Sequence, residues 1–91
     1  MNKEQQFENI FKCKWSTLVL EEISRGTKQP GILLRSIPGL TKKVLYQRLK
    51  KLEKFNYIKR QLIAIKPLKV HYTLQPAGRA VLKIIKMIRN L

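Results

Sequence analysis

The sequence predicts a mainly α-helical α+β fold: one small domain over residues 1–91 with several helices and a single β-hairpin. Three observations support this prediction. Apolar residues recur at helical spacing over residues 7–55, two strand-like segments occupy residues 57–74, and helical spacing returns from Pro76 onward. A chain of 91 residues is also short enough for one domain.

The first helical segment is expected from Phe7 to Ser24, in one piece or in two. Apolar side chains follow one another there at offsets of three and four, which is the pattern of an amphipathic helix. These side chains belong to Phe7, Ile10, Phe11, Trp15, Leu18, Val19 and Ile23. Gly26 is placed to end the segment, because glycine readily adopts the left-handed conformation that closes a helix.

A second, shorter helix should begin at Pro30, because the missing amide of proline costs nothing in the first turn. Its buried side can be supplied by Ile32, Leu33 and Ile37. The dipeptide Pro38-Gly39 then breaks the helix sharply.

Thr41 is a good N-cap for a third helix, expected over about residues 41–55. On a helical projection its apolar residues gather on one side, and a basic, hydrogen-bonding side lies opposite. The apolar positions are Val44, Leu45, Leu49 and Leu52, and the polar positions are Lys43, Tyr46, Gln47, Lys50 and Lys54. Asn56 is suited to the left-handed residue that follows a helix end.

A β-hairpin is expected over about residues 57–74. Residues 57–65 are rich in β-branched and long apolar side chains, as strands are. Residues 66–68 provide the turn. Residues 69–74 alternate strictly, and this alternation places on one face Val70, Tyr72 and Leu74.

A last helix is expected over about residues 76–91. Its main apolar stripe is formed by Val81, Ile84, Ile85, Ile88 and Leu91, and off this stripe lie Leu82 and Met87. Because a small core does not need this many apolar residues, we expect part of the helix to contact a second subunit.

The chain is strongly basic, with 20 lysine and arginine residues against 5 acidic residues and a net charge of +15. Residues 54–91 contain nine of the basic residues and no acidic one. Self-repulsion of this size opposes folding unless the charge meets an anionic partner. Nucleic acid is the first candidate, before a membrane surface or an acidic protein.

Catalysis, cofactors and metal binding are not expected. The chain has no aspartate, His71 is its only histidine, and it lacks both a nucleophile triad and a glycine-rich phosphate loop. Its single cysteine, Cys13, can form no intrachain disulfide, which is typical of a reducing compartment. No apolar signal segment or membrane span is visible, so we expect a cytoplasmic, nucleoid-associated protein that does not bind membranes.

Two helices joined by a short turn and followed by a basic hairpin form a winged helix-turn-helix arrangement. The second helix of such a pair lies in the major groove of DNA. The expected recognition helix therefore covers about residues 41–55. The hairpin of about residues 57–74 is the expected wing, which reaches the adjacent backbone or minor groove.

The chain resembles the HxlR-type winged helix-turn-helix transcriptional regulators of bacteria and archaea over nearly its whole length. The matching stretches are Cys13 to Trp15, Pro30 to Arg35, Ile37 to Leu45 and Arg48 to Glu53, followed by Pro67, Val70, Tyr72, Leu74 and Gly78. The resemblance implies a homodimeric regulator that binds double-stranded DNA, with a dimer built by the N-terminal and C-terminal helices. The chain departs from the family pattern at His71, where glutamate is frequent, and at Gln75, where threonine is frequent.

The candidate DNA-binding residues have side chains suited to phosphates or to base edges. On the recognition helix and its cap they are Thr41, Lys42, Lys43, Tyr46, Gln47, Arg48 and Lys50, and on the wing they are Lys66 and Lys69. The lysines suit phosphates, whereas Tyr46 and Gln47 can read bases. Arg48 lies between the two sides of its helix and could instead pair with Glu22 or Glu53.

Two alternatives stay open at this point. The charge suits a non-specific chromatin-coating protein or an RNA- or ribosome-associated protein equally well, although one basic helix face beside one hairpin favours a reader of duplex DNA. Cys13 could be a reactive, redox-sensing thiol beside Lys14, but a lone cysteine is more often a small packed side chain. Redox-sensing members of the family have their cysteine near the position of Asn2, so the resemblance does not transfer that role to Cys13.

Overall fold

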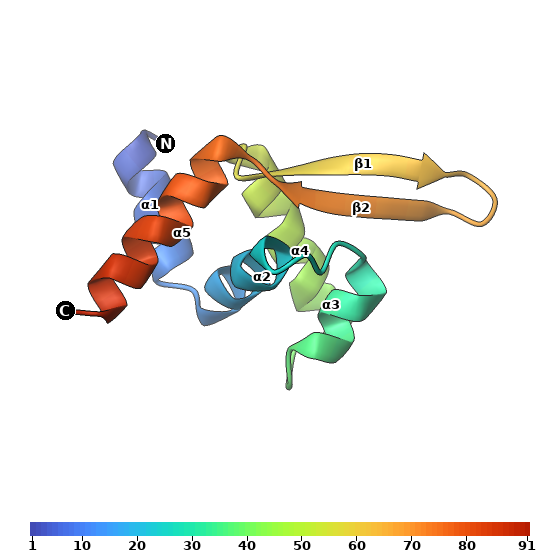
Figure 1. Ribbon diagram of the computed structural model, residues 1–91, viewed down its shortest axis with the longest axis horizontal. Coiled ribbons are helices and arrows are strands. Elements are labelled where there is room, and N and C mark those ends of the chain that lie inside the picture. The colour runs from blue at the N-terminus through green and yellow to red at the C-terminus, as the bar shows by residue number, and fades with distance from the viewer.

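The computed structural model describes residues 1–91, which form five helices and one two-stranded antiparallel sheet. The helices are α1 (Lys3–Phe11), α2 (Lys14–Ser24), α3 (Pro30–Ser36), α4 (Lys42–Lys54) and α5 (Pro76–Arg89), and the strands are β1 (Ile58–Ala64) and β2 (Lys69–Leu74). Helix α2 packs against all four other helices and against β2. The hairpin projects away from the helices (Figure 1). The predicted α+β winged helix-turn-helix architecture is confirmed.

The N-terminal helical segment is divided into two helices. The break lies at Lys12 and Cys13, where the extended backbone of Cys13 caps α2. Helix α1 begins earlier than predicted, because the side chains of Asn2 and Gln5 accept hydrogen bonds from each other's backbone amides. Gly26 follows α2 with a φ of +99°, and so ends the helix as predicted.

Helix α3 begins at Pro30 and buries Leu33, with Ile37 buried just beyond its end. The prediction that Ile32 is buried is wrong, because Ile32 is exposed and Leu34 packs against the core instead. At about 100° per residue, Leu34 lies nearer than Ile32 to the line through Leu33 and Ile37. A helix of seven residues has room for only one such line of contact.

Helix α4 has the cap and the buried side that the sequence predicts. The hydroxyl of Thr41 accepts a hydrogen bond from the amide of Val44 at 3.2 Å. Three leucines on the inner side are almost completely buried: Leu45, Leu49 and Leu52. The turn before the helix is also as predicted, since Gly39 has a φ of +82° and its missing side chain would lie 3.4 Å from the ring of Trp15.

A three-residue elbow, residues 55–57, joins α4 directly to β1. Its middle residue, Asn56, has the predicted left-handed conformation, with a φ of +61°. The flanking Phe55 and Tyr57 are buried, and their rings meet edge to face with centroids 5.8 Å apart. Because both anchors lie in the core, the elbow holds the start of the hairpin against the end of α4.

The hairpin pairs Ile58 with Leu74 at its base, and β1 contains a bulge between Leu62 and Ala64 near its end. Residues 65–68 form the turn. A third segment joins the sheet edge, since the amide of Tyr72 donates a 2.8 Å hydrogen bond to the carbonyl of Lys28 in the α2–α3 connection. The base of the hairpin is therefore tied to the helices, while its far end extends beyond them (Figure 1).

The buried stripe of α5 differs from the predicted one. The residues that face the core are Gly78, Val81, Leu82 and Ile85. Of the predicted apolar stripe, Val81 and Ile85 face the core while Ile84, Ile88 and Leu91 are exposed, and Leu82, which was expected off the stripe, is buried. The cause is Gly78: a side chain there would lie 2.1 Å from the carbonyl oxygen of Tyr57, so only the glycine side of α5 can approach the elbow so closely.

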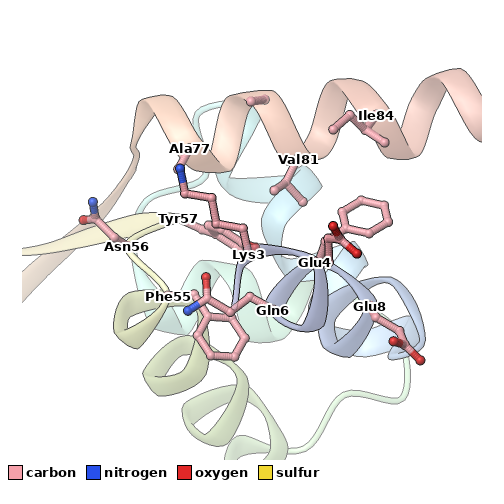
Figure 2. Close-up of a pocket in the computed structure, with 12 residues that line it drawn as sticks. Lys3, Glu4, Gln6, Glu8, Phe55, Asn56, Tyr57, Ala77, Val81 and Ile84 are labelled. Atoms are coloured by element: carbon pink, nitrogen blue, oxygen red, sulfur yellow. The ribbon is translucent and has the colours of Figure 1, made fainter. Parts of the chain in front are cut away.

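An ion pair fixes the far end of α5 to α2. The buried carboxylate of Glu21 contacts the guanidinium of Arg89 and lies 3.7 Å from that of Arg25. Along the other side of α5, a mostly apolar groove of about 960 Å³ separates this helix from α1. Figure 2 shows Val81 and Ile84 on one wall of the groove, Glu4 and Gln6 on the other, and Tyr57 at its base. None of the helices combines the length and the apolar character needed to cross a membrane.

Candidate nucleic-acid interface

The outer face of α4 carries most of the predicted DNA-binding side chains in exposed positions. These are Lys42, Lys43, Tyr46, Gln47 and Lys50, together with the cap residue Thr41. Their positions follow from the leucines on the inner side, which fix the rotation of the helix about its axis. The result is an exposed row of ammonium groups interrupted by one phenol and one amide, which can meet phosphates and base edges respectively.

Arg48 differs from the other predicted residues of this face. It is half-buried, and its Nε is buried without a hydrogen-bond partner. It forms no ion pair with Glu53 or with Glu22, whose carboxylate lies 2.8 Å from Arg25 instead. Its positive charge lies close enough to Cys13 to stabilise the thiolate. Arg48 therefore lies at the seam between α4 and the start of α2, beside the exposed row and not within it.

A second group of cationic side chains lies on the hairpin. The predicted wing residues Lys66 and Lys69 are exposed at and beside the turn, and Lys59 and Arg60 are exposed on β1. Tyr72 is the buried residue of β2 beside these cations. Burial raises the pKa of the Tyr72 phenol, Arg60 acts in the opposite direction through its charge and a hydrogen bond, and the nearby Glu53 and Tyr46 raise the pKa further. The phenol thus lies near enough to Arg60 of β1 and to Glu53 and Tyr46 of α4 for their charges to affect its pKa.

Sequence reasoning missed the apolar character of the wing tip. Four large apolar side chains there are exposed: Leu62, Ile63, Ile65 and Leu68. Side-chain type predicts a strand here, and a run of such residues normally indicates a strand that is buried on both faces. The signal that could have revealed them is the absence of further strands in the sequence, because a two-stranded sheet has no neighbours to cover its far end.

Cys13 is half-buried at the start of α2. Burial alone would raise the pKa of its thiol, but the nearby polar groups of Ser16, the charge of Arg48 and the amide of Trp15 together lower it below its ordinary value. A lowered pKa increases the fraction of reactive thiolate.

His71 lies on β2, where it is half-buried and its Nε2 has no hydrogen-bond partner. The residue lies opposite Gln61 near the middle of the hairpin. No three side chains of histidine, cysteine, aspartate or glutamate lie together as they would to hold a metal ion.

Comparison with known proteins places this architecture in a family. The profile of HxlR-like helix-turn-helix proteins matches residues 10–91. The HTH-type transcriptional regulator sll1512 of Synechocystis sp. is 33% identical over 87 residues, which cover 96% of this chain and 64% of that regulator. The chain thus spans less than two thirds of that relative's length.

Solved structures of related regulators have the same fold. The reduced form of the regulator YodB from Bacillus subtilis superposes with a TM-score of 0.84 at 26% identity, covering 99% of this chain and 89% of YodB. An HTH-type regulator named ytcD superposes with a TM-score of 0.85 at 30% identity, covering 99% of this chain and 92% of that one. The match to the family profile extends over nine tenths of the sequence and includes every element of the interface. The chain belongs to the HxlR-like helix-turn-helix family.

Proposed function

We propose that this protein is a transcriptional regulator that binds double-stranded DNA sequence-specifically as a homodimer. Helix α4 enters the major groove, and the hairpin contacts the adjacent backbone or minor groove. The observation that carries the proposal is the outer face of α4, where Lys43, Gln47 and Lys50 are exposed above a fully buried leucine side. The sequences of HTH-type transcriptional regulators among its relatives support the same function.

The roles of the individual side chains follow from their chemistry. Lys42 and Lys43 lie in the first turn of α4, where the free amides and the helix dipole also favour a phosphate. Lys50 lies two turns further along and suits a second phosphate. Tyr46 and Gln47 lie between these lysines and can meet base edges. Lys66 and Lys69 extend the phosphate contacts from the wing.

The dimer is proposed to form through α1 and α5. Their surface carries large exposed apolar residues, namely Phe11, Ile84, Met87, Ile88 and Leu91. The apolar groove between the two helices is continuous with this surface (Figure 2). A second copy would cover both, and two α4 helices related by a two-fold axis would read half-sites about 34 Å apart. A regulator of this kind works where the chromosome lies, so we place it in the cytoplasm at the nucleoid.

Selection of bound duplexes from a random pool, followed by binding at increasing salt, tests the proposal. We expect a roughly palindromic sequence to be enriched and its affinity to fall steeply with salt, as for about six to ten phosphate contacts. Lys43→Ala and Lys50→Ala should weaken binding to every duplex, whereas Gln47→Ala should also relax the base preference. Lys12→Ala, at an exposed lysine outside α3, α4 and the hairpin, is the matched control.

Two results would contradict the proposal. Equal binding of selected and bulk duplexes would indicate a non-specific chromatin-coating protein, and tighter binding of RNA than of duplex DNA would indicate an RNA- or ribosome-associated protein. A Gln47→Ala variant with an unchanged base preference would remove that residue from the base-reading set. Sedimentation of the free protein tests the dimer separately, since Ile88→Glu should produce monomers.

A further inference from the structure

The tip of the wing has a composition that phosphate binding alone does not require. Ile65 is 71% exposed and Leu68 is 68% exposed, more than any other large apolar residue except the chain ends Met1 and Leu91. Both belong to the turn, where the sheet has no covering element. Keeping these side chains in water is unfavourable unless a partner covers them.

We propose that the side chains of Ile65 and Leu68 form a wedge that enters the minor groove of duplex DNA, partly unstacks one base step and bends the helix axis. The inference rests on the proposed DNA-binding function and names what the wing does at the duplex. Apolar side chains that insert between base steps in this way bend DNA toward the major groove.

The shape of the hairpin suits a concave partner. The base of the hairpin is buried at Ile58 and Tyr72, whereas the side chains from Leu62 to Leu68 are nearly all exposed. The hairpin therefore ends in a narrow apolar projection beyond the helices (Figure 1). The bulge near Leu62 increases the twist of the ribbon just before this projection. A projecting tip cannot act as a docking groove, but it can enter one.

The charge of the hairpin indicates that the partner is nucleic acid. Lys66 lies between Ile65 and Leu68 within the turn, Lys69 follows Leu68 directly, and residues 54–91 contain no acidic residue. A minor groove offers phosphates on both walls and an apolar gap between stacked bases, so the two lysines and the two apolar side chains can be satisfied together. The hairpin that carries the tip is also joined directly to α4 by the elbow at residues 55–57.

Base unstacking and bending provide the direct test. The probe is a duplex of about 30 base pairs with several TA steps, a fluorescent aminopurine in place of the adenine at one of them, and a donor and an acceptor dye at its ends. Wild-type protein should increase the aminopurine fluorescence and bring the two dyes closer. The double variant Ile65→Ala/Leu68→Ala should lose both signals and bind about tenfold more weakly, with an unchanged dependence on salt.

Two control variants separate the wedge from other effects of the hairpin. Leu62→Ala removes an exposed leucine from the strand instead of the turn, and it should leave the unstacking signal in place. Lys66→Ala/Lys69→Ala should lower the slope of affinity against salt by about 2, while the saturated complex still shows unstacking. Thermal melts of each variant confirm that the fold is retained.

The outcomes that overturn the inference are distinct from those that overturn the proposed function. Binding that depends on Lys43 but gives no fluorescence or distance change, with or without Ile65 and Leu68, refutes the wedge alone. Self-association of the free protein that the double variant abolishes, with DNA binding unchanged, also refutes it and assigns the tip to a second copy. If neither the wild-type protein nor any variant binds duplex DNA, the proposed function itself is wrong.

Discussion

Gly78→Ala is expected to destabilise the protein, although alanine normally stabilises a helix. A side chain at Gly78 would lie 2.1 Å from the carbonyl oxygen and 2.9 Å from the carbonyl carbon of Tyr57. The first distance is 1.3 Å shorter than the 3.4 Å at which ordinary van der Waals contact begins. The carbonyl cannot turn away easily, because it accepts a 2.9 Å hydrogen bond from the amide of Gln75. Helix α5 must therefore move away from the elbow.

The size of the effect follows from two opposing contributions. Overpacking against a backbone that cannot yield costs about 3 kcal/mol, and the higher helix propensity of alanine returns up to about 1 kcal/mol. The free energy of unfolding should therefore fall by about 2 kcal/mol. For a domain of this size, that corresponds to a melting temperature lower by about 8 to 16 °C.

Urea and thermal unfolding followed by circular dichroism, at one fixed protein concentration, measure this change. Gly31→Ala is the matched control, since Gly31 is also helical and the nearest atom to its added side chain is the flexible end of Arg35, at 3.8 Å. It should raise stability by about 0.5 kcal/mol. Equal stability of the Gly78→Ala variant and the wild type would refute the close approach of α5 to Tyr57.

Three further expectations concern other contacts. Arg89→Ala should lower the free energy of unfolding by about 1 kcal/mol, because the buried carboxylate of Glu21 keeps only a longer ion pair, and an unchanged urea midpoint would contradict this role. The rate of Cys13 alkylation should rise at a lower pH than in the unfolded chain, and Arg48→Ala should move that pH upward, because its charge lowers the pKa of the thiol. Burial raises the pKa of Tyr57, so its contribution to stability is complete below the pKa of the unfolded chain and is lost as pH rises through the folded value. A Tyr57→Phe variant should therefore lose less stability than the wild type in alkaline urea titrations, and an identical loss would count against the buried phenol.

The order of helices and strands could be predicted because local signals mark each boundary. Thr41 and Pro30 begin helices through their own backbone chemistry, and Gly26 and Asn56 end them through positive φ angles. The inner side of α4 was also predictable, since its leucines leave only one side of the helix apolar. These features depend only on residues that are close together in the chain, so they can be predicted from a single sequence.

The rotation of α5 could not be predicted from periodicity. Val81 and Ile85 belong to two overlapping apolar stripes, one continuing to Ile88 and the other including Leu82. The choice between them is made by Gly78 against the backbone of Tyr57, a contact between residues 21 positions apart in sequence. Likewise, the candidate site was predicted from residue type, but the inward position of Arg48 depends on where α2 begins relative to α4.

The elbow at residues 55–57 fixes the angle between α4 and the hairpin. Phe55 and Tyr57 are both anchored in the core, and only Asn56 lies between them. The angle between α4 and the hairpin is therefore set when the chain folds. If α4 and the hairpin bind duplex DNA as proposed, the duplex must conform to that angle, because the hairpin cannot swing to suit each duplex. Under the proposed function, substitutions at the tip would change what the hairpin contacts without changing its position along the duplex.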